Sequence, residues 1–169
     1  MNKIQEYHVH HKKKALEDLK SQISKPSFPM SLWEAVLLNQ YVDLNKIYSI
    51  QEGHTIDEET VHKSGQFKFV FNQAELKWPI YDQGGWSSAF ECYADTVTFA
   101  YSHQVTKLQA YRQHIRKLFS EVRRHNCCTV ILFDQKFCKE LAGDAQLMFD
   151  DVESSQSHLY GSLLSGDAP

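Results

Sequence analysis

Residues 86–137 read WSSAFECYADTVTFAYSHQVTKLQAYRQHIRKLFSEVRRHNCCTVILFDQKF, and their apolar side chains recur with the period of an α-helix. In the first part of this stretch the apolar series begins at Trp86, Phe90 and Tyr93 and continues at position 97, which is the spacing of one apolar stripe. A second helix is predicted over about residues 104–124, with a third after it. The core predicted from these three helices comprises Trp86, Phe90, Tyr93, Val97, Leu108, Tyr111, Ile115, Phe119, Phe133 and Phe137.

The whole chain is predicted to be mainly α, with about five to six helices in a compact domain and one small β-hairpin before the central helix pair. Residues 1–25 are interpreted as an N-terminal helical arm, and residues 26–30, which contain Pro26 and Pro29, as a linker. Residues 31–150 are predicted to form a single helical domain, with the hairpin near 67–78. Residues 151–169 are rich in Ser and acidic residues, so we expect a disordered tail.

Several polar residues predict where helices begin. Ser31 and Glu34 have the spacing of a capping box, and Asp43 can cap the short helix that follows it. Gly84-Gly85 is expected to break the chain before the central helices. Thr129 is expected to cap the third long helix, which should end at Gly143.

The hairpin is predicted from an alternating pattern. Phe67, Phe69 and Phe71 alternate with other residues, which is the period of a half-buried strand. Residues 74–78 can return as the second strand. The turn between them, Asn72-Gln73, lacks the glycine that such turns favour.

Composition excludes some classes of protein. A formal net charge of −3 indicates neither a general nucleic-acid binder nor a strongly acidic mimic, and a hydrophobic content of 42% suffices for a packed core. The sequence shows no signal peptide and no apolar run of about 18 residues. We therefore expect an intracellular protein, cytoplasmic or nuclear, with no membrane partner.

Histidines and cysteines are the first candidates for chemistry. His8, His10 and His11 could bind a transition metal weakly, but no Cys or carboxylate completes a site, and the lysines at 12–14 oppose a cation. A solvated arm is the simpler interpretation. Cys127 and Cys128 lie close to His125 in sequence, which does not establish the geometry of a nucleophile and its base.

Carboxylates and glycines complete no catalytic or cofactor motif either. Asp82, Asp95 and Asp134 are scattered along the chain, and Cys92 and Cys138 fit packing positions within helices. No glycine-rich loop carries the lysine of a phosphate-binding motif. The sequence therefore predicts a protein that is not an enzyme, with no cofactor, no metal and no small-molecule substrate.

Basic residues on the second long helix give the best binding signal. They are predicted to share an outward face opposite the core, and they comprise Arg112, Arg116, Lys117, Arg123 and Arg124. Such a stripe could neutralise the phosphates of RNA or DNA. It could equally be an ordinary solvated face or a surface for an acidic protein segment, and we consider a protein partner or a plain surface the better interpretation.

The packing residues also resemble a known family. Three series carry the resemblance: W-x-x-A-F-x-x-Y-x-x-x-V-x-F-x-Y-x-H from Trp86, L-x-x-Y-x-x-x-I-R-x-L from Leu108 and F-D-x-x-F from Phe133. They are similar to a domain of tyrosine-recombinase (DIRS-like) retrotransposons that lies in their gag-like first protein or ahead of the reverse transcriptase. The upstream segment L-W-E-x-V-x-x-x-x-Y-V-D-L from Leu32 fits the same family. The resemblance covers roughly residues 31–149.

This resemblance implies a gag-like structural or assembly protein, or a host protein derived from one. It supplies no catalytic residue. The chain departs from the family in having Leu147, Met148 and Phe149 where members continue into a Trp-bearing segment, and it has no zinc knuckle for capturing nucleic acid. We therefore expect a non-enzymatic module that binds copies of itself or another protein, with nucleic-acid binding as the alternative.

Overall fold

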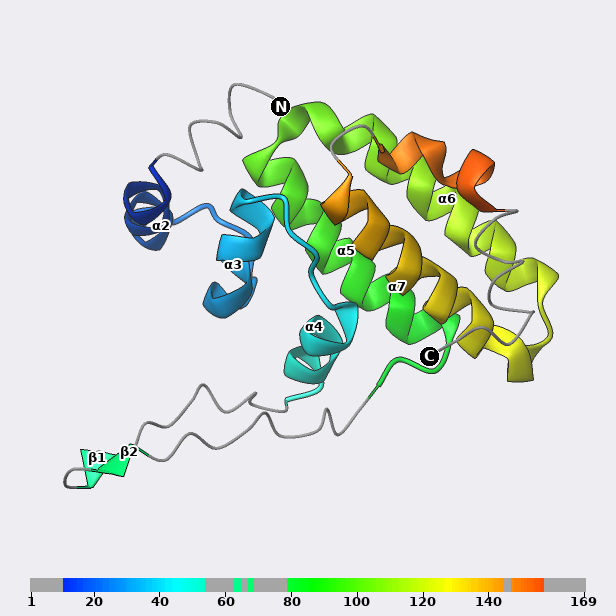
Figure 1. The fold of residues 1–169 in the computed structure, drawn as a ribbon, viewed down its shortest axis with the longest axis horizontal. Coiled ribbons are helices and arrows are strands. Elements are labelled where there is room, and N and C mark those ends of the chain that lie inside the picture. The colour runs from blue at the N-terminus through cyan, green and yellow to red at the C-terminus, as the bar shows by residue number, and fades with distance from the viewer. Residues whose placement is uncertain (1–10, 54–62, 65–66, 69–78, 145–146, 157–169) are drawn as a thin grey trace.

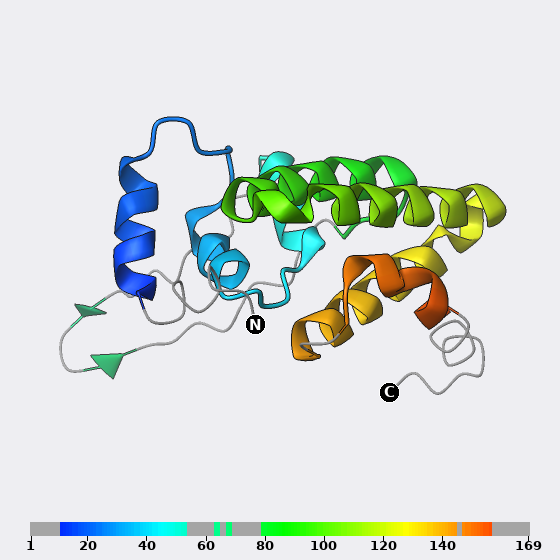
Figure 2. The ribbon, with the colours of Figure 1, turned by 90° about the horizontal axis from the view of Figure 1, so that it is seen from above.

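Three long helices form the body of the molecule in the computed structural model, which describes residues 11–53, 63–64, 67–68, 79–144 and 147–156. They are α5 (Gln83–Ala100), α6 (Val105–Glu121) and α7 (Cys127–Gly143). The 3-10 turn η1 (Ser102–Gln104) reverses the chain between α5 and α6, and η2 (Arg124–Asn126) does so between α6 and α7. The three helices thus run up, down and up beside one another (Figures 1 and 2).

Shorter helices cover this body at its N-terminal and C-terminal sides. They are α2 (Lys12–Ser21), α3 (Met30–Leu37) and α4 (Leu44–Gln51), with η3 (Phe149–Asp151) lying against α6. Tyr101, at the end of α5, donates its hydroxyl hydrogen to the carbonyl of Leu37 at 2.6 Å and ties α3 to α5. The prediction of a mainly helical protein is confirmed. Among the described helices none is long and apolar enough to cross a membrane.

The predicted core lies where the periodicity placed it. Of its ten members, nine are buried, and Tyr93 is partly buried. Trp86 stacks on Phe90 with ring centroids 4.8 Å apart, and Tyr111 stacks on Phe137 at 5.4 Å. Burial of one face of each helix is what the 3.6-residue period requires.

The predicted hairpin near 67–78 is not supported. The described strands are β1 (Lys63–Ser64) and β2 (Phe67–Lys68), which pair antiparallel with Lys63 opposite Lys68. The predicted second strand lies outside the described residues. Residues 67–68 pair with residues 63–64, which precede them in the chain.

The observed helix starts confirm one predicted cap and contradict another. The Asp43 cap is confirmed, because its carboxylate accepts the backbone N–H of Asn45 at 3.0 Å. The capping box of Ser31 is wrong, since α3 begins at Met30 with Pro29 as the residue before it. Ser31 therefore lies within the first turn of α3, and Pro29 stands at the N-cap position without a side-chain cap.

The glycine pair at 84–85 does not break the chain but lies within the first turn of α5. Asp82 caps this helix by accepting the N–H of Gly85 at 2.9 Å. A Cβ at Gly85 would lie 3.2 Å from Cζ of Tyr48, so the missing side chain lets α4 and α5 approach closely.

Two further boundaries differ from the predictions. Helix α7 begins at Cys127 rather than at Thr129, and it ends at Gly143 as predicted. Residues 152–156 are helical and Val152 is buried, so the boundary predicted between domain and tail falls inside packed structure. The remainder of the predicted tail, 157–169, lies outside the described residues, as do residues 1–10 of the predicted arm.

Candidate interaction surfaces

The predicted basic stripe does not form one helical face. Helix α6 ends at Glu121, and the backbone of Arg123 is extended, so Arg123 and Arg124 leave the axis of α6. Arg112 forms an ion pair with Glu91 of α5, which joins the two helices. Arg112 is thus engaged within the chain, and its predicted part in binding stays a prediction.

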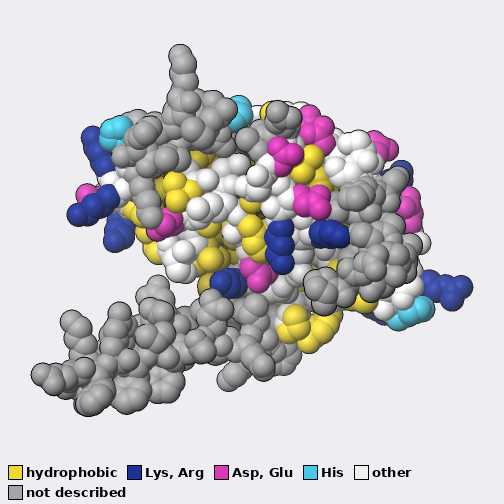
Figure 3. Space-filling view, viewed as in Figure 1, with side chains coloured by type: hydrophobic (Ala, Val, Ile, Leu, Met, Phe, Trp, Pro, Cys, Tyr) yellow, Lys and Arg dark blue, Asp and Glu magenta, His cyan; other side chains and the backbone are white. Residues whose placement is uncertain are grey.

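The remaining basic residues gather where α6 passes into α7. Arg116, Lys117, Arg123 and Arg124 are all exposed, and we call these four residues the basic end. Nζ of Lys117 lies 3.9 Å from Oε1 of Glu121, whereas no ion pair joins the three arginines to a described carboxylate. Figure 3 shows Lys or Arg side chains with a histidine at this end of the molecule. An exposed group of this kind attracts anions without selecting a particular one.

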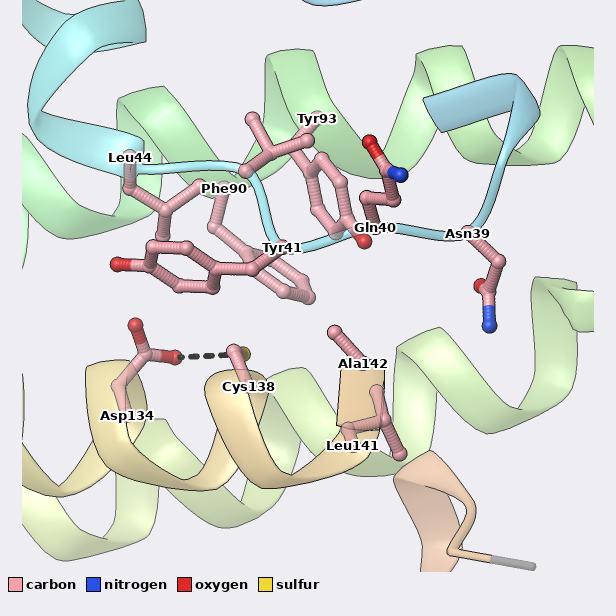
Figure 4. Close-up of a pocket in the computed structure, with 11 residues that line it drawn as sticks. Asn39, Gln40, Tyr41, Leu44, Phe90, Tyr93, Asp134, Cys138, Leu141 and Ala142 are labelled. Carbon is pink, nitrogen blue, oxygen red and sulfur yellow. Dashed lines mark hydrogen bonds between the residues drawn. The ribbon is translucent and has the colours of Figure 1, made fainter. Parts of the chain in front are cut away.

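A buried polar cluster, which the sequence did not reveal, lies between α6 and α7. Asp134 is 2% exposed, and the hydroxyl of Tyr111 donates to its Oδ1 at 2.6 Å. The thiol of Cys138, one turn further along α7, lies 3.6 Å from the same hydroxyl and 4.0 Å from Oδ1. Asp134 and Cys138 project from α7 toward Tyr41 (Figure 4).

Burial controls the protonation of this cluster. Loss of solvation raises the pKa of Asp134 from 3.8 to about 6. The hydrogen bond from Tyr111, and after it the indole N–H of Trp86, act in the opposite direction and lower this pKa. The Trp86 nitrogen is buried and faces the carboxyl without meeting hydrogen-bond geometry. Burial, and then the Asp134 charge, also raise the pKa values of Tyr111 and Cys138 well above their ordinary range.

These values limit what the cluster can do chemically. A nucleophilic cysteine needs a lowered pKa, and burial moves the pKa of Cys138 the other way. The cavity beside the cluster, lined by Tyr41, Tyr93 and Asp134 among others, measures about 20 Å³. Such a cavity holds about one water molecule, whereas small-molecule sites occupy roughly 300–1,000 Å³.

The other candidate residues stay apart. Cys128 is exposed and Cys127 is buried at the start of α7, while Cys92 on α5 is half-buried. Burial raises the pKa of Cys92, with the charge of Asp95 adding to it. Within the described part of the chain no group of three metal-binding side chains occurs. His11 is exposed, and His8 and His10 lie outside the described residues.

A groove lies between α2 and the helical body, and it is lined mostly by apolar side chains together with Asp18 and Gln22. Ala15 and Leu19 of α2 face Leu37 of α3 and Phe99 of α5 across a space of about 220 Å³, which we call the α2 groove. Phe99 is 38% exposed. In Figure 2 the helix α2 stands at one end of the molecule, apart from the three-helix body, and Figure 3 shows hydrophobic side chains at the surface on this side. Packed interiors have few voids larger than a water molecule, so α2 fills its groove incompletely.

Comparison with known proteins identifies no relative of this chain. The chain matches no protein-family model, no curated protein and no solved structure. The resemblance to DIRS-like retrotransposon proteins therefore stays a prediction that rests on the quoted residues.

Proposed function

We propose that this chain is a non-enzymatic assembly module of gag-like type, whose surface binds further copies of itself. The proposal is carried by the α2 groove, where Phe99 remains exposed beside an incompletely filled apolar space. Exposed apolar surface next to a groove is typical of protein–protein contact sites. The resemblance of residues 31–149 to gag-like proteins supports the same class of function.

The buried cluster supports binding rather than catalysis as the activity. A catalytic carboxylate or thiol must reach its substrate, and the general base must lie within hydrogen-bonding distance of the proton it takes. Asp134 is almost wholly buried beside a space for about one water molecule, and Cys138 is held protonated. We assign this cluster to the core of the module, and its function to the surface.

Self-association is tested by light scattering on the full chain over a range of concentrations. We expect dimers or larger species that increase with concentration, and we expect Phe99→Ser to shift them toward monomer. Leu132→Ser is the matched control, because Leu132 is 50% exposed on α7 and does not line the groove. A strict monomer at every concentration would contradict the proposal.

The basic end favours a second candidate function, the binding of RNA or DNA. Its three arginines are exposed and have no described carboxylate as an ion-pair partner. Contacts to three phosphates predict a roughly 20-fold loss of affinity for single-stranded RNA when the salt concentration rises fourfold.

The triple variant Arg116→Glu, Arg123→Glu, Arg124→Glu is expected to abolish this salt-dependent binding in a fluorescence-anisotropy titration. The control variant carries Lys13→Glu, Lys14→Glu and Lys20→Glu, the same change of net charge on exposed residues of α2. Equal losses in the two variants would indicate a general charge effect. No binding by the unaltered chain at low salt would eliminate this second candidate.

A further inference from the structure

Helix α2 is attached to the rest of the protein by few side chains. Its buried residues are Ala15 and Leu19, on one face of the helix, and Leu16 is partly buried against the core. No hydrogen bond or ion pair joins the side chains of residues 13–21 to another described element; Ser21 Oγ, for example, donates to the carbonyl of Asp18 within α2 itself. Apolar contact in the α2 groove therefore holds this helix in place.

Two prolines restrict the backbone of the segment between α2 and α3, in which Ile23 and Ser24 form a turn. Proline fixes its own φ and disfavours the helical region for the residue before it, so Pro26 restrains Lys25 and Pro29 restrains Phe28. Phe28 is buried edge-on against Trp33, with ring centroids 5.7 Å apart. This contact anchors the end of the segment, and so does the thiol of Cys92 on α5, which donates to the carbonyl of Ser27 at 3.5 Å. Residues 22–26 are left as the hinge, and within it the side chain of Ile23 is fully exposed.

The hinge is long enough for α2 to reach a neighbouring molecule. With the turn at Ile23 and Ser24 opened, the five residues of the hinge span at most roughly 17 Å, about one and a half helix diameters. Whatever surface α2 contacts in its own chain is equally complementary to α2 of an identical chain. Exchange therefore requires no new interface, and the balance between the two arrangements depends on protein concentration.

We infer that α2 exchanges between two copies of the chain, so that Leu19 of each copy enters the groove beside Phe99 of the other. This inference rests on the proposed self-association and names the segment that mediates it. The incompletely filled groove and the absence of described polar contacts make it easy for α2 to leave the groove of its own chain, which exchange requires. A closed form predominates when the protein is dilute and the exchanged dimer when it is concentrated.

The test mixes two full-length chains that each carry one new cysteine, Leu19→Cys in one and Phe99→Cys in the other. Both chains also carry Cys128→Ser, which removes an exposed native thiol. A short bismaleimide cross-linker is added, and the products are separated on a denaturing gel. Exchange predicts a cross-linked dimer of the two different chains that increases with concentration, because these residues line one groove.

Lys20→Cys mixed with Phe99→Cys is the matched control, because Lys20 is exposed on α2 and does not line the groove. The double variant Leu19→Cys, Phe99→Cys in one chain verifies that the cross-linker spans the groove, and it should react within the chain when dilute. If the mixed pair yields no more dimer than the Lys20→Cys control while light scattering still detects oligomers, exchange is wrong and self-association stands. If light scattering detects monomer alone, both fail.

Discussion

Trp86→Ala is expected to lower the free energy of unfolding by about 3–5 kcal/mol. Trp86 is 0% exposed, stacks on Phe90 and contacts Phe119 of α6 at 5.8 Å between ring centroids. Its removal leaves a cavity between α5 and α6 that close-packed neighbours cannot fill. Because domains of this size are stable by roughly 5–15 kcal/mol, we expect the variant to be partly or wholly unfolded rather than folded and inactive.

Denaturant titration followed by far-UV circular dichroism measures this loss. Tyr81→Ala is the control, because it removes an aromatic side chain that is 71% exposed, and such substitutions change stability by about 0.5 kcal/mol or less. Trp86→Phe keeps an aromatic ring in the core and deletes the unpartnered indole N–H, so its loss should be smaller. A loss below about 1 kcal/mol for Trp86→Ala would contradict the packing of α5 on α6.

Asp134→Asn is expected to stabilise the protein at neutral pH. The pKa of Asp134 is raised from 3.8 to about 6 on folding, so between these values the folded state binds more protons than the unfolded one. Stability from this group therefore falls as pH rises through that window. At pH 7 the ionised carboxylate lowers the free energy of unfolding by up to about 3 kcal/mol. Asparagine removes this loss, and its carbonyl oxygen still accepts from the Tyr111 hydroxyl.

The measurement compares the free energy of unfolding of the two proteins from pH 4 to pH 7. The difference should be near zero at pH 4 and grow in favour of Asp134→Asn toward pH 7. Burial lowers the pKa of His114 on α6, which makes stability fall as pH drops, but this contribution is common to both proteins and cancels in the difference. Asp95→Asn is the control on an exposed carboxylate of α5. A difference independent of pH would show that Asp134 is not a buried titrating group.

The helical period could be predicted from the sequence because it depends only on the spacing of residues within one helix. An apolar stripe must face a core wherever the helix lies, so Phe90, Leu108 and Phe137 could be placed inside without knowing their neighbours. The Asp43 cap was readable for the same reason, since its acceptor bond reaches only two residues along the chain. The position of Asp134 within the apolar run VILFDQKF was the one sequence signal for the buried cluster, because helical spacing places it beside the core.

The end of α6 could not be predicted from the sequence in this way. A continuous helix through Arg123 and Arg124 agrees with local propensity, yet the chain turns at Val122, which is half-buried. Val122 packs against the core, which is a tertiary contact that local propensity does not encode. As a consequence the two arginines belong to the loop before α7, and the surface they form is an end of the bundle rather than a helix face.

The sequence alone determined that this chain is mainly helical and which side chains form its core, because those features depend on spacing within single helices. Tertiary structure decided which polar groups meet. The hydrogen bond from Tyr111 to Asp134 joins residues 23 positions apart, and the ion pair of Arg112 with Glu91 joins residues 21 apart. The groove that receives Leu19 is likewise formed by α2, α3 and α5 together. Contacts between separate helices depend on how the helices pack, and no spacing along one segment encodes that arrangement.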